Sequence, residues 1–365
     1  MYQQAIDEAE ATESVAPVIS SPNENRREDD QLPEPAGQTI GEYQHCLVHF
    51  DGQHSAIFKS KDENGDLVAV KVTVPHLMGA PHDSKREAQL LREAASPHVI
   101  RLVETFGLTG GRLMLVLPFM RHTFEQLLHQ DLVTASQIRN HLGDLFRALV
   151  HIHSLGIIHR DVKPANLLMD SPAGPAYLGD FGIAWQEGSE GSEPPDAKII
   201  DVCTTCYRPP EILFGCRSYT TALDMWSAGC VVAEAISAGH RRLFDSGPVG
   251  SDLALIHSIF TAMGTPDGTT WPVSFFFFFF FFLSFFLSGR NLQADAGTQE
   301  SARLPDWGKI EFQQYAGRPW EEIVQGSSSN GRDLVSKLVV YESRDRLSAA
   351  EVWMHFPMTS YIAIS

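Results

Sequence analysis

The chain has 365 residues, of which 43% are hydrophobic and 20% charged, enough for one large domain or two closely packed lobes with a buried core. Its net charge of −17 argues against binding to nucleic acid or to an anionic membrane through general electrostatics. The N-terminus is acidic and polar, so we expect no secretory signal. The five cysteines are few and scattered, and we therefore predict reduced thiols in the cytoplasm, the nucleus or both.

The first 39 residues differ in composition from the rest of the chain. They contain nine acidic side chains against two arginines, together with several serines and prolines. A segment of this kind cannot bury enough apolar surface to offset the entropy lost on folding. We therefore predict that residues 1–39 form a disordered acidic tail.

The remaining chain changes from a strand pattern to a helix pattern. Short β-type runs lie at 46–48, 67–72 and 113–117, and one helical stretch lies at about 84–95. Beyond residue 121 apolar residues recur at helical spacing, as in the stripe Ile138, Leu142, Leu145, Phe146, Leu149 and Ile152. This order predicts an α+β fold with a small strand-rich lobe over 40–118 and a larger helical lobe over 119–358.

One segment of the larger lobe is foreign to this pattern. Residues 275–287 read FFFFFFFFLSFFL, which is shorter than the ~20 residues of a membrane span. A buried strand of identical phenylalanines would also fill a core poorly. Codons for Val273-Ser274 and for Gln293 can match splice-donor and splice-acceptor sequences, and poly-Phe matches a T-rich tract. We interpret residues 273–293 as a translated intron; a transcript that keeps this stretch would contradict this.

Several chemically distinctive motifs follow one another along the chain. In order they are Val68-Ala69-Val70-Lys71, Arg86-Glu87, His159-Arg160-Asp161-Val162-Lys163-Pro164-Ala165-Asn166, Asp180-Phe181-Gly182 and Arg208-Pro209-Pro210-Glu211. Each alone is a weak signal, but their order and spacing together are specific. On these motifs the chain resembles eukaryotic protein kinases over about residues 43–358, and the resemblance implies the two-lobed protein kinase fold.

The resemblance also implies roles for five polar side chains. Lys71 would hold the α- and β-phosphates of ATP and be oriented by an ion pair with Glu87. Asp161 would accept or orient the proton of the substrate hydroxyl. Asn166 and Asp180 would supply the oxygen ligands that Mg²⁺ prefers.

Two further residues would act beside Asp161. Lys163 would reach the transferred phosphate, and its place in Asp-x-Lys-x-x-Asn resembles serine/threonine rather than tyrosine kinases. Thr204 would support Asp161 and Lys163. His159 is interpreted as structural, Asp224 as a brace for the catalytic loop, and Arg346 as the buried partner of Glu211.

The resemblance predicts an apolar slot for the nucleotide. Phe119 and Met120 would form the hinge that binds adenine through the backbone, with Leu117 behind them as gatekeeper. The full set of predicted nucleotide-binding residues is Val48, Gly52, Ile57, Ala69, Lys71, Leu117, Phe119, Met120, Leu168 and Asp180.

Two departures from the family pattern affect the expected regulation. Phe50, Gly52 and Ser55 stand where three glycines are usual, so we expect ATP binding to be altered but not abolished. Ile199 occupies the position of the activating phosphothreonine of cyclin-dependent kinases. The acidic stretch that precedes it raises the hypothesis that a carboxylate meets Arg160 in place of phosphate.

Other motifs resemble the cyclin-dependent-kinase-like (CMGC) branch, among them Gly264-Thr265-Pro266 and Leu304-Pro305-Asp306-Trp307. The missing phosphosite and the absence of a cyclin-gripping sequence in the helix at 84–93 resemble the single-subunit CDK-activating kinases of fungi. This predicts a protein substrate, namely the activation loop of a cyclin-dependent kinase in cell-cycle control, and does not indicate a cyclin-like subunit. The alternatives are a pseudokinase scaffold, a cyclin-dependent kinase proper, and an inert product of a faulty gene model.

Overall fold

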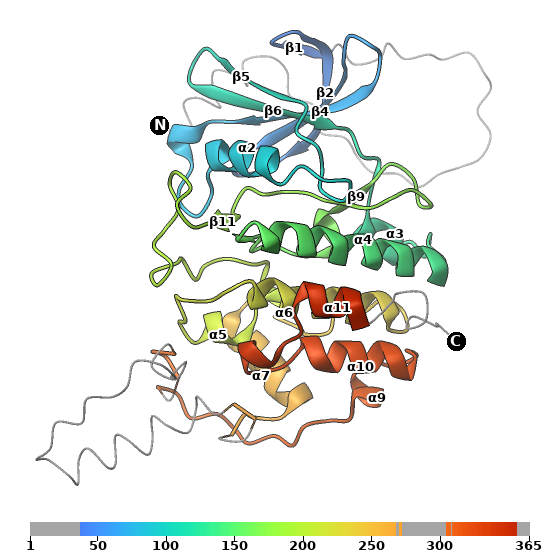
Figure 1. Cartoon of the computed structure of the whole chain (residues 1–365), viewed down its shortest axis with the longest axis vertical. Coiled ribbons are helices and arrows are strands. Elements are labelled where there is room, and N and C mark those ends of the chain that lie inside the picture. Colours follow the sequence, from blue (N-terminus) through green and yellow to red (C-terminus); the bar gives the residue numbers. More distant parts are fainter. Residues whose placement is uncertain (1–36, 268–269, 272–303, 308, 356–365) are drawn as a thin grey trace, which may run out of the picture. The chain divides into compact units, whose positions relative to one another are not determined.

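The computed structural model describes residues 37–267, 270–271, 304–307 and 309–355 (Figure 1). The predicted tail, apart from its last three residues, and the whole segment 273–293 lie outside this part of the chain. The described residues confirm the α+β fold with a strand-rich small lobe and a helical large lobe.

The small lobe is built on a six-stranded antiparallel sheet of order β1-β2-β3-β4-β6-β5. The strands are β1 (Gln38–Ile40), β2 (Tyr43–Asp51), β3 (Ala56–Lys61), β4 (Leu67–Thr73), β5 (Glu104–Leu108) and β6 (Arg112–Pro118). The start of β1 at Gln38 falls inside the range 1–39 for which we predicted disorder, so this boundary was placed too late. Gly41 makes the sharp β1–β2 turn at φ +61°, where a Cβ would strike the ring of Phe106.

One face of this sheet carries a small core, and the other face meets the rest of the molecule. Phe58, Val68, Val70, Met114 and Val116 are buried together. They alternate along β3, β4 and β6 with residues of the opposite face. The helix α2 (Ser84–Glu93) packs against β6, and its Leu90 and Leu91 join the larger core.

The large lobe is a helical assembly around a continuous apolar core. The helices are α3 (Phe124–His129), α4 (Ala135–Ser154), α5 (Pro210–Leu213), α6 (Ala222–Ile236), α7 (Asp252–Met263), α9 (Trp320–Ile323), α10 (Ser329–Leu338) and α11 (Ala349–His355). The predicted stripe on α4 is buried throughout. Its Thr134 and Gln137 form a capping box, which explains why the helix begins there. Helix α11 packs on α4, and α10 packs on α6.

Short strand pairs shape the part of the large lobe that faces the sheet. They are β7 (His122–Thr123), β8 (Ile157–Ile158), β9 (Leu167–Met169), β10 (Tyr177–Leu178) and β11 (Trp185–Gln186). β9 pairs with β7 and β10, and β11 pairs with β8. The β8–β9 loop carries the motif His159–Asn166, and the β10–β11 loop carries Asp180-Phe181-Gly182. None of the helices in the described part of the chain combines the length and apolar character that a membrane span requires.

Candidate active site

Lys71 lies where β4, α2 and the segment after β10 meet. Its Nζ is 2.7 Å and 3.0 Å from the two carboxylate oxygens of Glu87 on α2. The same nitrogen is 3.1 Å from Oδ1 of Asp180. The structure therefore brings these three predicted residues, from distant parts of the sequence, into one charged cluster.

The position of α2 is fixed at its first turn. The Asp83 carboxylate accepts hydrogen bonds from the backbone N–H groups of Lys85 (2.9 Å) and Arg86 (3.0 Å). The backbone N–H of Asp83 donates to the carbonyl of Gly182 at 3.1 Å. This last bond ties the start of α2 to the Asp180-Phe181-Gly182 motif, so the partners of Lys71 are held relative to each other.

Burial and charge set the protonation of this cluster. The Glu87 side chain is 1% exposed and that of Lys71 is 12% exposed. Burial opposes the charge on Lys71, but the attraction of Asp180 and Glu87 outweighs it and raises the pKa of Lys71. The attraction of Lys71 holds the pKa of Asp180 well below its usual range. At neutral pH the cluster thus presents a fixed cation beside an ionised carboxylate.

Asp161 is held on both of its carboxylate oxygens. Oδ1 accepts hydrogen bonds from the hydroxyl (2.8 Å) and the backbone N–H (3.0 Å) of Thr204. Oδ2 accepts from Nδ2 of Asn166 at 3.0 Å and lies 2.8 Å from Nζ of Lys163. Lys163 also donates to the Thr204 hydroxyl at 2.7 Å. The four predicted residues of this group form one closed network with a single orientation of the Asp161 carboxylate.

The loop that carries Asp161 is braced from α6. The carboxylate of Asp224 accepts hydrogen bonds from the backbone N–H groups of His159 (2.8 Å) and Arg160 (2.9 Å). Arg160 has φ +68°, a strained conformation for a residue with a side chain, and this brace offsets the strain. The His159 ring lies 3.0 Å from the Gly179 carbonyl and edge-on to Phe181, in agreement with a structural role.

Asn166 and Asp180 offer oxygen atoms suited to a hard cation. Asn166 uses its amide nitrogen to donate to Asp161, so its amide oxygen is the atom it can offer a metal. The Asp180 side chain is 50% exposed and ionised. Among the described residues, His, Cys, Asp and Glu side chains form no cluster of three that could hold a metal ion. Mg²⁺ is usually bound by one or two protein ligands together with substrate phosphates, and Asn166 and Asp180 fit this arrangement.

Most of the predicted apolar slot lies on the sheet face that carries Lys71. Ile57 pairs with Lys71 across β3 and β4, and Ala69 pairs with Leu117 across β4 and β6. Because paired residues share a face, Ile57, Ala69 and Leu117 line the same side as Lys71. Leu117, Met120 and Leu168 pack against the large core, and the Phe119 N–H donates to the Leu67 carbonyl at 3.0 Å.

Val48 and Gly52 differ from their predicted settings. Val48 pairs with Phe58, whose side chain belongs to the small core, and is 66% exposed. The neighbouring His49 instead places its ring edge-on to Phe119, with ring centroids 4.9 Å apart. Gly52 has a close neighbour in Phe50, whose ring lies 2.5 Å from where a Cβ would stand. In this structure, glycine is therefore required at position 52 because a side chain there would clash with the Phe50 ring.

Two histidines near the site carry no sequence motif and were missed. The rings of His54, in the β2–β3 loop, and His82, before α2, are stacked with centroids 4.0 Å apart. Burial and the neighbouring His54 lower the pKa of His82, which also lies within the electrostatic influence of Asp180 and Lys71. The stack ties the β2–β3 loop to the residues that precede α2. Only the fold brings these rings together, so spacing could not have shown it.

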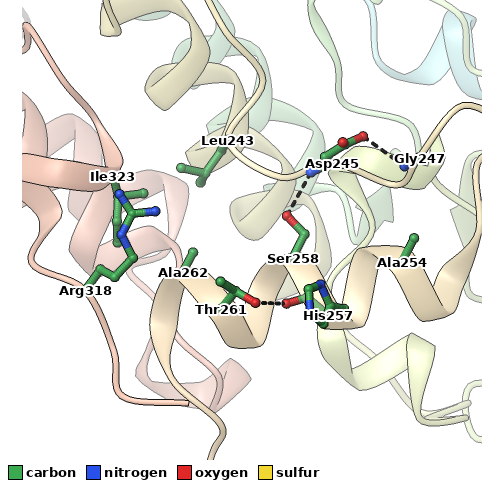
Figure 2. Close-up of a pocket in the computed structure, with 10 residues that line it drawn as sticks. All are labelled: Leu243, Asp245, Gly247, Ala254, His257, Ser258, Thr261, Ala262, Arg318 and Ile323. Carbon is green, nitrogen blue, oxygen red and sulfur yellow. Dashed lines mark hydrogen bonds between the residues drawn. The ribbon is translucent and has the colours of Figure 1, made fainter. Parts of the chain in front are cut away.

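Two hollows lie outside this cluster. One, of about 850 Å³, lies beside α2 and includes Arg86, Glu190 and Gly191 in its lining. The other, of about 430 Å³, lies beside α7 (Figure 2). Figure 2 shows His257 and Ser258 on α7 and Arg318 on a different segment across the hollow. Neither contains Lys71 or Asp161, so neither is the cleft predicted from the motifs.

Comparison with known proteins gives a consistent result. A family model described as "Protein kinase domain" matches residues 51–356. The chain is 32% identical to Serine/threonine-protein kinase csk1 of Schizosaccharomyces pombe over 316 residues, covering 85% of this chain and 92% of that protein. It is 30% identical to Cyclin-dependent kinase 20 of Danio rerio over 311 residues, covering 84% and 80%. The corresponding protein of Homo sapiens is 28% identical over 320 residues, covering 86% and 82%.

Proposed function

Because this chain belongs to the protein kinase family, as a serine/threonine kinase of the cyclin-dependent-kinase-like type, we propose that it phosphorylates the activation loop of a cyclin-dependent kinase. Kinases of this family use ATP and a divalent metal, generally Mg²⁺, and homologues act on protein substrates. The proposal therefore concerns which protein is phosphorylated and which side chains perform the transfer. Its location in the cytoplasm, the nucleus or both stays a prediction.

The Asp161 network is the observation that carries the proposed chemistry. With both oxygens of its carboxylate held, Asp161 can orient a substrate hydroxyl and take its proton as the oxygen attacks the γ-phosphorus. A new P–O bond forms to that oxygen while the bond between the γ-phosphorus and the β–γ bridging oxygen breaks, and ADP leaves. Lys163, 2.8 Å from Asp161, would reach the transferred phosphate. Positioning of this kind, together with electrostatic stabilisation, accounts for most of the barrier reduction in phosphoryl transfer.

The other cluster would bind the donor nucleotide. Lys71 would hold the α- and β-phosphates, and its pair with Glu87 fixes the direction of the ammonium group. Asn166 and Asp180 would hold Mg²⁺ through their oxygens. The metal supplies neutralisation of the phosphate charge when it is bound. Adenine would lie in the apolar slot beneath β3, β4 and β6, beside the hinge at Phe119 and Met120.

The choice of substrate is supported by the activation segment. Ile199, at the position where cyclin-dependent kinases carry their activating threonine, packs into an apolar cluster with Trp185, Tyr219 and others. Its carbonyl also accepts a hydrogen bond from the Tyr219 hydroxyl at 2.6 Å. The chain therefore lacks the modification site that its proposed substrates possess, as expected for an enzyme that acts before them.

The proposal is tested with the full chain, ATP, Mg²⁺ and a catalytically inactive, unphosphorylated cyclin-dependent kinase. We expect phosphate on the activation threonine of that kinase, none when this threonine is replaced by valine, and none from the Asp161→Asn variant. Phosphate on general protein substrates but not on this threonine would reject the substrate assignment and favour a cyclin-dependent kinase proper. Normal binding of partner proteins with no transfer to any of them would favour a pseudokinase scaffold, the alternative suggested by Phe50 and Ser55.

A further inference from the structure

The guanidinium of Arg160 is buried against a carboxylate of the activation segment. Its Nη1 donates to Oε1 of Glu193 and its Nη2 to Oε2, each at 3.2 Å. The Arg160 side chain is 0% exposed and that of Glu193 is 14% exposed. Two parallel hydrogen bonds of this kind give both charge neutralisation and a fixed orientation. A buried arginine next to Asp161 thus has a permanent anionic partner within the same chain.

Glu193 is held in place by groups other than Arg160. Its backbone carbonyl accepts a hydrogen bond from Nε1 of Trp185 at 2.9 Å. The Arg160 guanidinium lies 5.4 Å from the ring centroid of Tyr219 and 6.0 Å from that of Trp185. Burial acts against the charge of Glu193, but its hydrogen bonds and the attraction of Arg160 outweigh burial and lower the pKa of Glu193. The carboxylate is therefore charged in a site formed by several elements.

The same short segment also reaches α2. The carbonyl of Gly191 accepts a hydrogen bond from Nη1 of Arg86 at 2.8 Å, and Arg86 is 3% exposed. Nη2 of Arg86 donates to the Pro81 carbonyl at 2.6 Å, just before the helix. Gly191 thus contacts Arg86, which directly precedes Glu87, and Glu193 contacts Arg160, which directly precedes Asp161. This stretch links the two side-chain clusters of the site.

We propose that Glu193 is a positioning residue that replaces a phosphate group on the activation segment, so that the protein transfers phosphate without being phosphorylated there itself. A phosphate on this segment would carry roughly −1.5 to −2 charges and bind arginine through its oxygens. Glu193 supplies one charge and two oxygens at Arg160, which are enough to fill the two donors that point at it. Ile199 remains in the apolar cluster and takes no part in this contact.

The test uses the full chain and general protein substrates, so it does not depend on the substrate proposed above. The wild-type protein is treated with phosphatase until intact-mass measurement shows no phosphate, and initial rates on histone H1 and myelin basic protein are compared before and after. We expect equal rates. The Ser189→Ala/Ser192→Ala variant removes two nearby hydroxyls that could be phosphorylated, and it is expected to keep the wild-type rate.

Variants at position 193 then test the contribution of the Glu193 carboxylate to the rate. Glu193→Gln is expected to lower kcat roughly 10- to 100-fold through misplacement of Asp161 and Glu87, with the KM for ATP within about threefold. Glu193→Asp, which keeps the charge, should recover much of the rate. Glu190→Gln, an exposed carboxylate three residues earlier, is the matched control and should change nothing. Amide hydrogen exchange in α2 should rise in Glu193→Gln and stay unchanged in Glu190→Gln.

Two results would overturn the proposal. One is a loss of activity on phosphatase treatment that returns when the segment is phosphorylated again. The other is wild-type kinetics and wild-type exchange in α2 for Glu193→Gln. The phosphatase comparison requires no substitution, so a loss of activity in it overturns the proposal even if a change at position 193 weakens the fold. If the wild type labels neither protein, kinase activity on these substrates fails, and the exchange of α2 still decides the role of Glu193.

Discussion

At the scale of single residues, the hydroxyl of Thr204 completes the Asp161 network. It donates to Oδ1 of Asp161 at 2.8 Å and accepts from Lys163 at 2.7 Å, so it bridges two charged groups that also pair directly through Oδ2 of Asp161. The backbone N–H of Thr204 holds the same oxygen of Asp161 independently. Removing the hydroxyl therefore tests the contribution of the Thr204 side chain to the orientation of Asp161, while the backbone hydrogen bond is kept.

Thr204→Val keeps the shape of the side chain and the backbone bond but removes the bridge. We expect kcat to fall roughly 10- to 100-fold, because Asp161 and Lys163 lose their common partner, while the KM for ATP changes little. Thr204→Ser restores the hydroxyl and should restore most of the rate. Steady-state kinetics with one protein substrate make the comparison. Equal kcat for Thr204→Val and the wild type would show that the bridge has no function.

The pair between Glu211 and Arg346 is a stability feature of the large lobe. Its two hydrogen bonds are both 2.7 Å, and the side chains are 3% and 0% exposed. Replacing one partner leaves a buried charge without its counter-ion, so we expect Arg346→Met to lower the free energy of unfolding by about 3–5 kcal/mol. Urea titration followed by tryptophan fluorescence measures the change.

The matched control is the exposed pair between Asp333 and Lys337 on α10, at 2.8 Å with both side chains 47% exposed. Asp333→Asn should lower the free energy of unfolding by less than about 0.5 kcal/mol, because water screens such pairs. Equal effects of Arg346→Met and Asp333→Asn would contradict the assigned importance of burial.

At the scale of elements, the site depends on how α2 and the activation segment are attached to the two lobes. Asp83 ties α2 to Gly182, and Arg86 ties it to Gly191. The β2–β3 loop is attached through the stack of His54 on His82. The loop contains one glycine, Gly52, and is held by a side-chain contact between His54 and His82, whereas a glycine-rich loop would rely on backbone freedom.

The pH dependence of the activation segment follows from the chemistry of Glu193. Its pKa is lower in the folded than in the unfolded chain, where a glutamate has a pKa of about 4.3. The stabilisation by the pair with Arg160 is therefore fully present above that unfolded value and is lost as the pH falls through the lower folded pKa. The cations Arg86 and Arg160, which face Glu193, favour the charged carboxylate.

We expect the hydrogen-exchange protection of residues 189–198, corrected for intrinsic rates, to be the same at about pH 8 and about pH 5.5. A segment held by phosphothreonine, with a second pKa near 6, would lose charge over this interval. Protection that falls between the two pH values in the wild type, but not in Glu193→Gln, would contradict a carboxylate contact that persists in this range.

At the scale of the whole molecule, features with a periodic or ordered sequence signal were predictable. The two lobes follow from the change between strand and helix periods, and the buried stripe of α4 follows from its spacing. The clusters around Lys71 and Asp161 were expected from the order of the motifs, and the structure brings their residues within hydrogen-bonding distance. Each of these features depends on residues whose type and spacing carry information by themselves.

Features that depend on side-chain direction or on contacts between distant segments could not be predicted from the sequence. A bulge between Val48 and Phe50 changes which residue of β2 faces the hinge, so His49 takes the place expected for Val48. The acidic stretch raised the hypothesis of a carboxylate at Arg160, but its four acidic residues, Glu187, Glu190, Glu193 and Asp196, were equivalent in sequence. Only the fold of the segment, held by Trp185 and Arg86, selects Glu193.

The central claim is that Lys71 and Asp161 serve one transfer reaction, the first at the nucleotide and the second at the substrate hydroxyl. The most direct test is transfer of the γ-phosphate from ATP to protein by the full chain, with phosphoamino-acid analysis and nucleotide binding measured in parallel. We predict phosphoserine and phosphothreonine for the wild type, no transfer by Asp161→Asn with nucleotide binding retained, and loss of transfer in Lys71→Met. Undiminished transfer by either variant, when folded, would contradict the claim.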